Sequence, residues 1–252
     1  MKVIALFILG IVFVGCGPST QSPQFSNAKS IIGHNDFISV PKTINDFNSE
    51  YLSEELLDSI GRMELGCTAT HIGNRLVITA GHCLSPGMYN FTKDRACRKS
   101  YPISWGVRGT FPGYLTSRCK KIIAAENSME RDFAIIEVDY APKSEFNLYE
   151  YETPDRGHML TIYSHPMKRP LQWSKNCENL GNGNNGFYYK KRIQYECDTQ
   201  GGSSGAAVLD AENYEIIAIH NSGVSFSGDK NKATPVKNIL DKLEEEGVLL
   251  NL

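Results

Sequence analysis

Three side chains that together can carry out nucleophilic hydrolysis follow one another along this chain. His82 lies in the segment TAGHC, Asp132 begins the segment DFAIIEV, and Ser204 is the second serine of GSSG. A serine hydroxyl is a weak nucleophile at neutral pH, so it needs an imidazole that accepts its proton and a third group that orients the imidazole. These residues therefore predict a site in which Ser204 attacks, His82 is the general base and Asp132 orients it.

The sequence around each residue suits that chemistry. A carboxylate at the start of a buried strand is costly unless it has a partner, which applies to Asp132. The glycines near Ser204 allow a sharp turn, so the N–H groups of Gly202 and Ser204 are predicted to form an oxyanion hole. Each motif alone has an ordinary alternative, because satisfied histidines, solvated aspartates and Ser-Gly turns are common. The agreement of all three favours a hydrolase.

Short strands are the elements that must position these residues. Apolar runs of strand length, bounded by Gly, Pro, Asn, Asp or Ser, indicate antiparallel β architecture rather than βαβ units. A short helix is expected after Ser53, and a longer one over about residues 235–246, with Thr234 as its cap, Pro235 in its first turn and Gly247 at its end. The predicted strand runs are residues 76–78, 122–124, 133–138, 159–163, 206–209 and 216–219.

Composition narrows the class of protein. The 252 residues are 41% hydrophobic and 21% charged, which is typical of a globular chain with room for one large or two small domains. The formal net charge is −2. Because a net charge of this sign gives no indication of a basic surface that could bind a polyanion, we expect no nucleic-acid partner.

The N-terminus predicts export. Lys2 precedes an apolar run over residues 3–14 that is too short to span a bilayer comfortably, as in a signal peptide. The run ends at Cys16 in a sequence that resembles a bacterial lipobox, so residues 1–16 predict a signal with lipidation at Cys16 and an anchor to a bacterial membrane. An ordinary signal peptide cut nearby, giving a secreted or periplasmic protein, is the alternative. Residues 17–30, rich in Ser, Pro, Gln and Asn, are expected to form a flexible tether or propeptide.

Cysteine usage agrees with export. Of the seven cysteines, Cys16 belongs to the signal region and six remain. An even set in an exported chain predicts three disulfides, and six cysteines allow 15 pairings. Neither a CxxC pair nor an HxxxH spacing is present, so we expect no metal, and the hydrolysis needs no organic cofactor. The six are Cys67, Cys83, Cys97, Cys119, Cys177 and Cys197.

The three motifs resemble those of the chymotrypsin-like, or trypsin-fold, serine peptidases, in which the triad runs in the order His, Asp, Ser. TAGHC is similar to the family's TAAHC, DFAII to its DIALL, and GSSG to its GDSG. The resemblance covers about residues 31–243. It implies an all-β domain over residues 31–247, with two six-stranded antiparallel β-barrels over about 31–140 and 150–233. The active site would lie between the barrels.

The resemblance also implies disulfide pairs. It pairs Cys67 with Cys83, on either side of the histidine motif. A second bridge would join Cys177 to Cys197, just before the nucleophile turn. This leaves Cys97–Cys119 as the third pair.

One position departs from the animal trypsins. They carry Asp before the catalytic serine, where it pairs with the amino terminus freed on activation, whereas this chain has Ser203. The sequence is more similar to the bacterial glutamyl-endopeptidase branch. Cleavage between Ser30 and Ile31 would give an N-terminus like those of its mature members, and it would sever an anchor at Cys16.

Two predictions for substrate preference conflict. In glutamyl endopeptidases a hydroxyl and a histidine bind the substrate's glutamate, and Thr199 and His220 occupy matching positions. Asp198 instead stands where trypsins place the aspartate that selects Arg or Lys. A carboxylate in the pocket would repel glutamate, so we favour Thr199 and His220, with a buried core histidine as the alternative for His220. Gly223 would leave room for substrate backbone beside the pocket.

The sequence thus predicts an exported serine endopeptidase that acts on peptide or protein substrates. The alternative from another class is a catalytically inert binding module on a protease fold. A protease-chaperone with a separate peptide-binding domain is disfavoured, because too little chain follows Leu243. The oligomeric state is not predicted.

Overall fold

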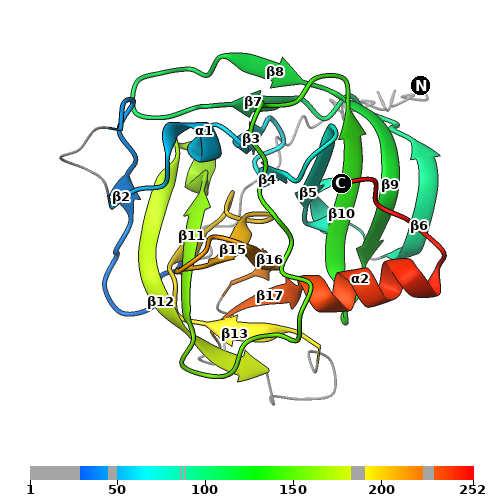
Figure 1. Ribbon diagram of the computed structural model, residues 1–252. Helices are drawn as coiled ribbons and strands as arrows, with labels where there is room; N and C mark the ends of the chain where they lie inside the picture. The colour runs from blue at the N-terminus through cyan, green and yellow to red at the C-terminus, as the bar shows by residue number, and fades with distance from the viewer. Residues whose placement is uncertain (1–28, 45–49, 86, 88, 183–190, 224–229) are drawn as a thin grey trace, which may run out of the picture.

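Two antiparallel β-sheets, one from each half of the chain, form the computed structural model (Figure 1). The structure describes residues 29–44, 50–85, 87, 89–182, 191–223 and 230–252. Cys16, the predicted signal segment and nearly all of the predicted tether lie outside these residues. Within the described ranges, no helix is long and apolar enough to cross a membrane.

The first sheet contains eight strands in the order β6-β9-β10-β5-β4-β3-β7-β8 and is strongly curled. It has two strands more than the six expected, and its edges are β6, which pairs with β9, and β8, which pairs with β7. Its edge strands β6 and β8 do not pair with each other among the described residues. The strands are β3 (Ile60–Met63), β4 (Thr68–His71), β5 (Leu76–Thr79), β6 (Tyr89–Ala96), β7 (Ile103–Trp105), β8 (Leu115–Ser117), β9 (Cys119–Asn127) and β10 (Asp132–Val138).

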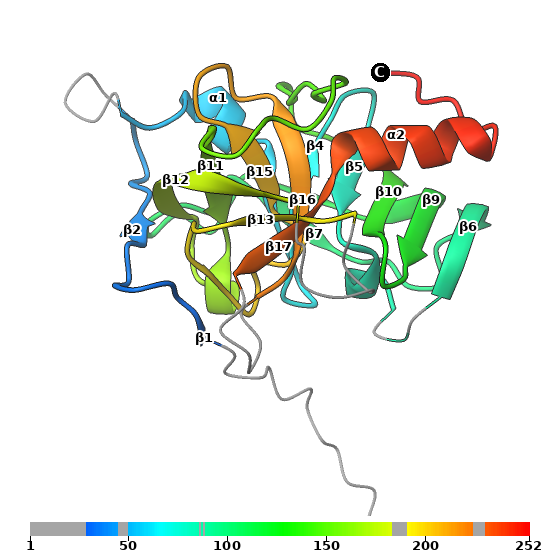
Figure 2. The same ribbon diagram turned by 90° about the horizontal axis from the view of Figure 1, so that it is seen from below.

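The second sheet closes into a six-stranded barrel, because β11 pairs with β12 as well as with β15. A seventh strand, β2 (Ile38–Ser39), adds to β12, although it falls in the range expected for the first barrel. The described part of the chain therefore begins along the outside of the second barrel, running from β1 to β2 (Figure 2). The barrel strands are β11 (Met159–Ser164), β12 (Gln172–Asn182), β13 (Ile193–Tyr195), β15 (Ala207–Asp210), β16 (Ile216–Ser222) and β17 (Asn231–Pro235).

Two α-helices, two 3₁₀ turns (Gly81–Cys83 and Pro166–Lys168) and a two-stranded ribbon complete the described elements. Helix α1 (Glu54–Leu57) is capped as predicted, since the Ser53 side chain accepts from the N–H of Leu56. Helix α2 (Val236–Glu245) has Pro235 as its N-cap residue and no side-chain cap, so the prediction that Thr234 caps it is wrong. Strands β1 (Lys29–Ser30) and β14 (Thr199–Gln200) pair antiparallel.

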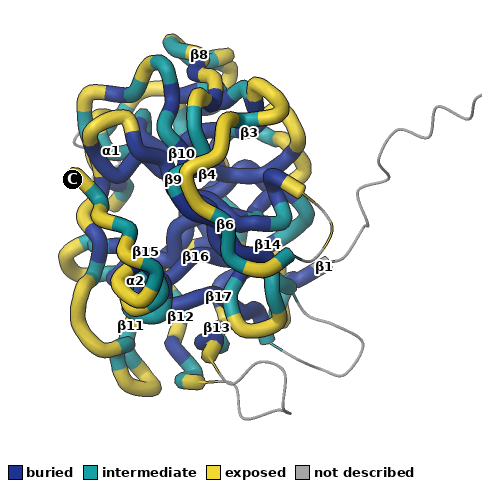
Figure 3. The backbone as a smooth tube through the Cα atoms, turned by 90° about the vertical axis from the view of Figure 1, so that its right-hand side faces the viewer, coloured by how far each residue is buried: buried dark blue, intermediate teal, exposed yellow. Residues whose placement is uncertain are grey.

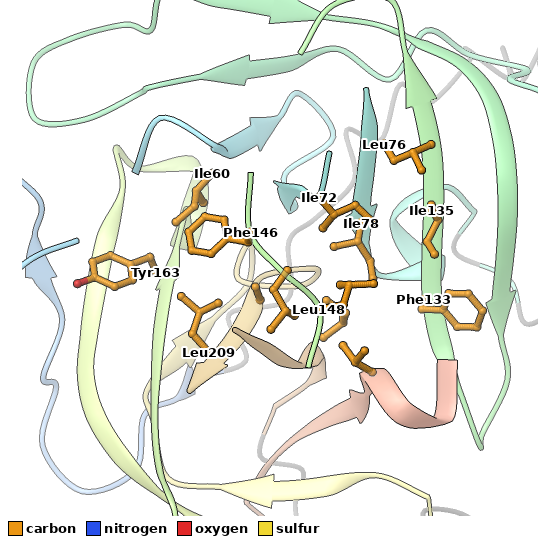
Figure 4. Packing of buried hydrophobic residues seen from close by; sticks show 14 of the residues in the cluster. Ile60, Ile72, Leu76, Ile78, Phe133, Ile135, Phe146, Leu148, Tyr163 and Leu209 are labelled. Atoms are coloured by element: carbon orange, nitrogen blue, oxygen red, sulfur yellow. The ribbon is translucent and has the colours of Figure 1, made fainter. Parts of the chain in front are cut away.

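Apolar side chains from both sheets form one shared core. Ile78 and Phe133 of the first sheet and Leu209 of the second belong to the same buried cluster, and Phe146 and Leu148 come from the segment between the sheets (Figure 4). Burial concentrates on these inner strands, while the turns are exposed (Figure 3). Because apolar burial contributes roughly 25 cal/mol per Å², this cluster holds the two halves in one arrangement.

His71, His165 and His220 are buried, and burial lowers the pKa of each imidazole. His165 is 1% exposed, and its pKa falls to about 4 because desolvation disfavours the charged ring. Its Nδ1 lies 3.0 Å from the Arg169 carbonyl oxygen, an acceptor that opposes this shift. The unfolded chain therefore binds protons more readily than the folded protein below the ordinary histidine pKa of about 6.5.

Acidification should accordingly destabilise the protein from about pH 6.5 downward, with His165 contributing about 2 kcal/mol of the loss by pH 5. In His165→Gln the fall in unfolding free energy between pH 7 and pH 5 should be smaller by that amount. Urea titrations at the two pH values measure it. His34→Gln, at an exposed histidine, is the control and should keep the wild-type pH dependence.

Candidate active site

The fold brings His82 and Asp132 into contact. Asp132 is the first residue of β10, and His82 lies on the 3₁₀ turn Gly81–Cys83 that follows β5, the neighbour of β10. The Asp132 carboxylate accepts from the His82 backbone N–H at 3.0 Å and lies 2.7 Å from the imidazole Nδ1. A carboxylate at Nδ1 favours the tautomer that carries its proton there, which leaves Nε2 able to accept one.

The position of Asp132 is fixed from the second barrel. Its backbone N–H donates to Thr234 Oγ1 at 3.1 Å, and the same hydroxyl accepts from the Asn221 side-chain amide at 2.7 Å. Thr234 and Asn221 are both buried. Thr234 therefore ties the start of β10 to the other half of the chain, a role that its sequence context did not reveal.

The turn that carries Ser204 is held against the first sheet by Thr68. The Thr68 N–H donates to the Ser204 carbonyl oxygen at 2.8 Å, and its hydroxyl donates to the Gly202 carbonyl oxygen at 2.9 Å. The Ser204 carbonyl oxygen also lies 3.9 Å from the sulfur of Cys83, the residue after His82. In the described structure the Ser204 hydroxyl makes no hydrogen bond to His82, and such contacts often tighten only when substrate binds.

Gly202 has a backbone conformation that other residues rarely adopt, with φ at +103°. A Cβ atom there would lie 2.5 Å from the His165 carbonyl oxygen and 2.8 Å from the Met167 nitrogen, so only glycine fits. Among the described residues, neither the Gly202 nor the Ser204 N–H donates to an acceptor. Two such open amides can stabilise an oxyanion.

The carboxylate of Asp198 is occupied by the N-terminal segment. It is 2% exposed and accepts from the backbone N–H groups of Ile32 at 2.9 Å and Asp36 at 2.7 Å. The next residue, Thr199, is fully buried, and its hydroxyl has no hydrogen-bond partner in the described part of the chain. The Asp198 carboxylate is thus already hydrogen-bonded, whereas the Thr199 hydroxyl is free to bind a ligand.

His220 is buried and contacts Tyr195, with its Nδ1 2.5 Å from the phenolic oxygen. Burial, and to a smaller extent the neighbouring His82, together lower its pKa to about 3. The ring is therefore neutral at physiological pH. It can offer hydrogen bonds to a ligand but no positive charge.

The disulfides of the structure are Cys67–Cys83, Cys97–Cys119 and Cys177–Cys197. These are the pairs that the resemblance implied. Cys67, Cys83 and His82 place three metal-ligating atoms close together. Because the two sulfurs are bonded to each other, they offer no thiolate to a metal.

A family model described as a trypsin-like peptidase domain matches residues 67–219. This chain belongs to that family. The match runs through all three motifs.

Solved structures of similar fold agree with the family assignment. A Glu endopeptidase in complex with MPD is 20% identical in sequence, with a TM-score of 0.63. The match covers 86% of this chain and 98% of the endopeptidase chain. VesB protease of Vibrio cholerae is 16% identical, with 84% and 67% covered and a TM-score of 0.59. The inactive form of a serine-to-alanine mutant of Rv3671c from M. tuberculosis is 11% identical, with 84% and 99% covered and a TM-score of 0.58. The sequence matches none of the curated proteins with which it was compared.

Gly205 sets how closely the Ser204 turn approaches the first sheet. Its φ is +84°, and a Cβ atom there would overlap the Thr79 hydroxyl and the Thr68 carbonyl oxygen. Gly205→Ala should therefore lower the free energy of unfolding by about 3 kcal/mol or more, since the obstructing oxygen is backbone. Gly157→Ala is the matched control. Gly157 has φ at +92° but open space around it, so we expect a loss of only about 1 kcal/mol.

Chemical denaturation of the two variants measures the difference. Equal losses would show that the turn moves freely to accept a methyl group. The proposed tight seating of Ser204 would then be wrong.

Proposed function

We propose that this peptidase is a serine endopeptidase with His82, Asp132 and Ser204 as its catalytic triad. The observation that carries the proposal is the hydrogen-bonded pair of half-buried His82 and buried Asp132, together with a serine turn that has two open amides. Family membership supports peptide-bond hydrolysis, and the resemblance of the three motifs supports the serine mechanism.

In this mechanism Ser204 attacks the substrate carbonyl while His82 Nε2 accepts the hydroxyl proton. Asp132 keeps the ring oriented and stabilises its charged form. The N–H groups of Gly202 and Ser204 receive the negative charge that develops on the carbonyl oxygen. His82 then donates the proton to the leaving amine, which departs and leaves an acyl-enzyme. Water, activated by the same imidazole, releases the acid product and restores the hydroxyl.

The protein is proposed to act outside the cytoplasm. Three disulfides are typical of an oxidising compartment. The signal-like residues 1–16 support export, with Cys16 as a lipid anchor or with simple secretion as the alternative.

An inert binding module is the competing hypothesis for this fold. Such modules usually lack a triad residue, whereas all three are present in this chain. The open amides of Gly202 and Ser204 also favour catalysis, because a binding module has no need to leave them without acceptors.

Ser204→Ala should abolish labelling by a small fluorophosphonate and lower peptide turnover by about a millionfold. Ser203→Ala is the matched control, since the Ser203 hydroxyl contacts Ser164 Oγ at 3.0 Å rather than facing a substrate. The control should remain labelled. Gel fluorescence and mass spectrometry of the adduct measure both outcomes, and persistent labelling of Ser204→Ala would refute the assignment.

The proposed preference is for glutamate before the scissile bond. The buried, unpartnered hydroxyl of Thr199 can donate to a carboxylate, and His220, on strand β16 of the second barrel, is the second polar group of the predicted pair. The alternative preference for Arg or Lys requires Asp198 to face the substrate. Its carboxylate instead accepts two backbone hydrogen bonds from residues 32 and 36, which favours the glutamate hypothesis.

Thr199→Val should lower kcat/KM for a glutamyl peptide about 10- to 100-fold, because a hydrogen bond to a charged group is lost. The matched glutamine peptide should lose much less. Thr70→Val is the control, because the Thr70 hydroxyl is also buried and unpartnered in the described structure but lies in the first sheet. Steady-state assays with the peptide pair measure the ratio, and cleavage only after Arg or Lys would transfer the role to Asp198.

A further inference from the structure

The chain's own residue Ser30 lies against the proposed specificity pocket. Strand β1 pairs antiparallel with β14, and Ser30 stands opposite Thr199 in the register. Ser30 is 3% exposed. A residue that precedes the predicted cleavage point is therefore buried beside the hydroxyl assigned to substrate recognition.

Gly223 lies directly against the Ser30 side chain. A Cβ atom on Gly223 would overlap the Ser30 hydroxyl and would lie 2.7 Å from the Ser30 Cβ. Ser30 thus contacts both the strand of Thr199, its partner in the register, and Gly223, which the sequence places beside the predicted pocket. A substrate side chain cannot use the space beside Gly223 while Ser30 is there.

Asn231 lies at the start of β17 and holds Ser30 in this space. Its side-chain amide nitrogen donates to the Ser30 carbonyl oxygen at 3.0 Å and to the Cys197 carbonyl oxygen at 2.7 Å. Asn231 is fully buried, and its Oδ1 has no partner in the described part of the chain. The same Oδ1 would lie 3.5 Å from a Cβ atom on Gly223. A fully buried polar group is therefore directed at the occupied space.

We propose that Asn231 is a specificity-determining residue and that Ser30 fills its pocket in the uncut chain. When β1 leaves, the Asn231 amide that now donates to the Ser30 carbonyl oxygen donates to a carboxylate oxygen of the substrate's glutamate. This inference rests on the proposed function. It adds to the predicted pair Thr199 and His220 a third polar group, which the sequence did not single out.

Strand β1 can leave while the residues that follow it stay bound to Asp198. The chain after Ser30 is held separately, because Ile32 and Asp36 donate to the Asp198 carboxylate. The part of β1 that must move is two residues long. Its departure therefore breaks few contacts, and cleavage between Ser30 and Ile31 would make it permanent.

Asn231→Asp tests the pocket residue with little change of shape. A carboxylate facing the substrate's glutamate repels it, so the ratio of kcat/KM for a glutamate peptide to that for the matched glutamine peptide should fall at least tenfold. Only enzyme whose pocket is free of Ser30 can bind either peptide, and this fraction is the same for both. The ratio therefore does not depend on how often β1 occupies the pocket. A wild-type ratio in Asn231→Asp would overturn the role of Asn231.

Asn179→Asp is the matched control. Asn179 is also fully buried in the second barrel, but its amide donates to the Pro154 and Asp155 carbonyl oxygens. It should lose stability and keep the wild-type ratio. A ratio shift of equal size in Asn179→Asp would show that any buried charge perturbs the pocket, and would also overturn the proposal.

Ser30→Arg tests the occupant in the full chain. An arginine side chain does not fit against Gly223, so β1 should be displaced and labelling by a peptidyl phosphonate with a glutamate side chain should become at least tenfold faster. Ser39→Arg, at an exposed position of β2, is the control and should label at the wild-type rate. Equal rates for wild type and both variants would show that Ser30 does not block the pocket.

A small fluorophosphonate without a glutamate side chain tests the serine mechanism separately from the pocket assignments. It should label wild type, Ser30→Arg and Ser39→Arg at similar rates, because Ser204 itself is unchanged. Absence of labelling in every protein would overturn the serine mechanism. Normal labelling without the ratio and rate changes would overturn only the assignments of Asn231 and Ser30.

Discussion

The buried carboxylate of Asp132 is the group on which the arrangement of this site depends. A charge that is 4% exposed is costly without partners. It has two from His82, and its backbone is held by Thr234 of the other barrel. One set of contacts around Asp132 thus does three things. It orients the imidazole of His82, fixes the position of β10 and helps to hold the two sheets together. Changing any of them disturbs the other two.

The rest of the site follows the same plan, in which short polar contacts cross between the halves over a shared apolar core. Thr68 of the first sheet holds the turn of the second, and Asn221 of the second holds the start of β10 through Thr234. The apolar cluster supplies most of the attraction but little direction, whereas the hydrogen bonds fix the relative position of the sheets. This division suits a site whose atoms come from both halves.

The all-β class, the C-terminal helix and the short strands were predictable, because the apolar runs and their turn residues are local signals. Strand β6 was not, since it is an edge strand with mostly exposed or half-buried polar residues and no clear alternation. Thr234 was assigned to a helix cap on local grounds, while its partner Asp132 lies 102 residues away. Asn231 carried no motif at all. Residues whose roles depend on distant partners leave no pattern along the chain.

The contact between Thr68 and Gly202 joins residues 134 positions apart. A growing chain that has already formed the His82–Asp132 pair still lacks the serine turn, and it lacks the strand that bears Asn221 and Thr234. The full set of contacts at the site can therefore form only after nearly all of the chain has been made. Synthesis itself acts as a delay, which separates the time when most of the chain exists from the time when the contacts of the site can be complete.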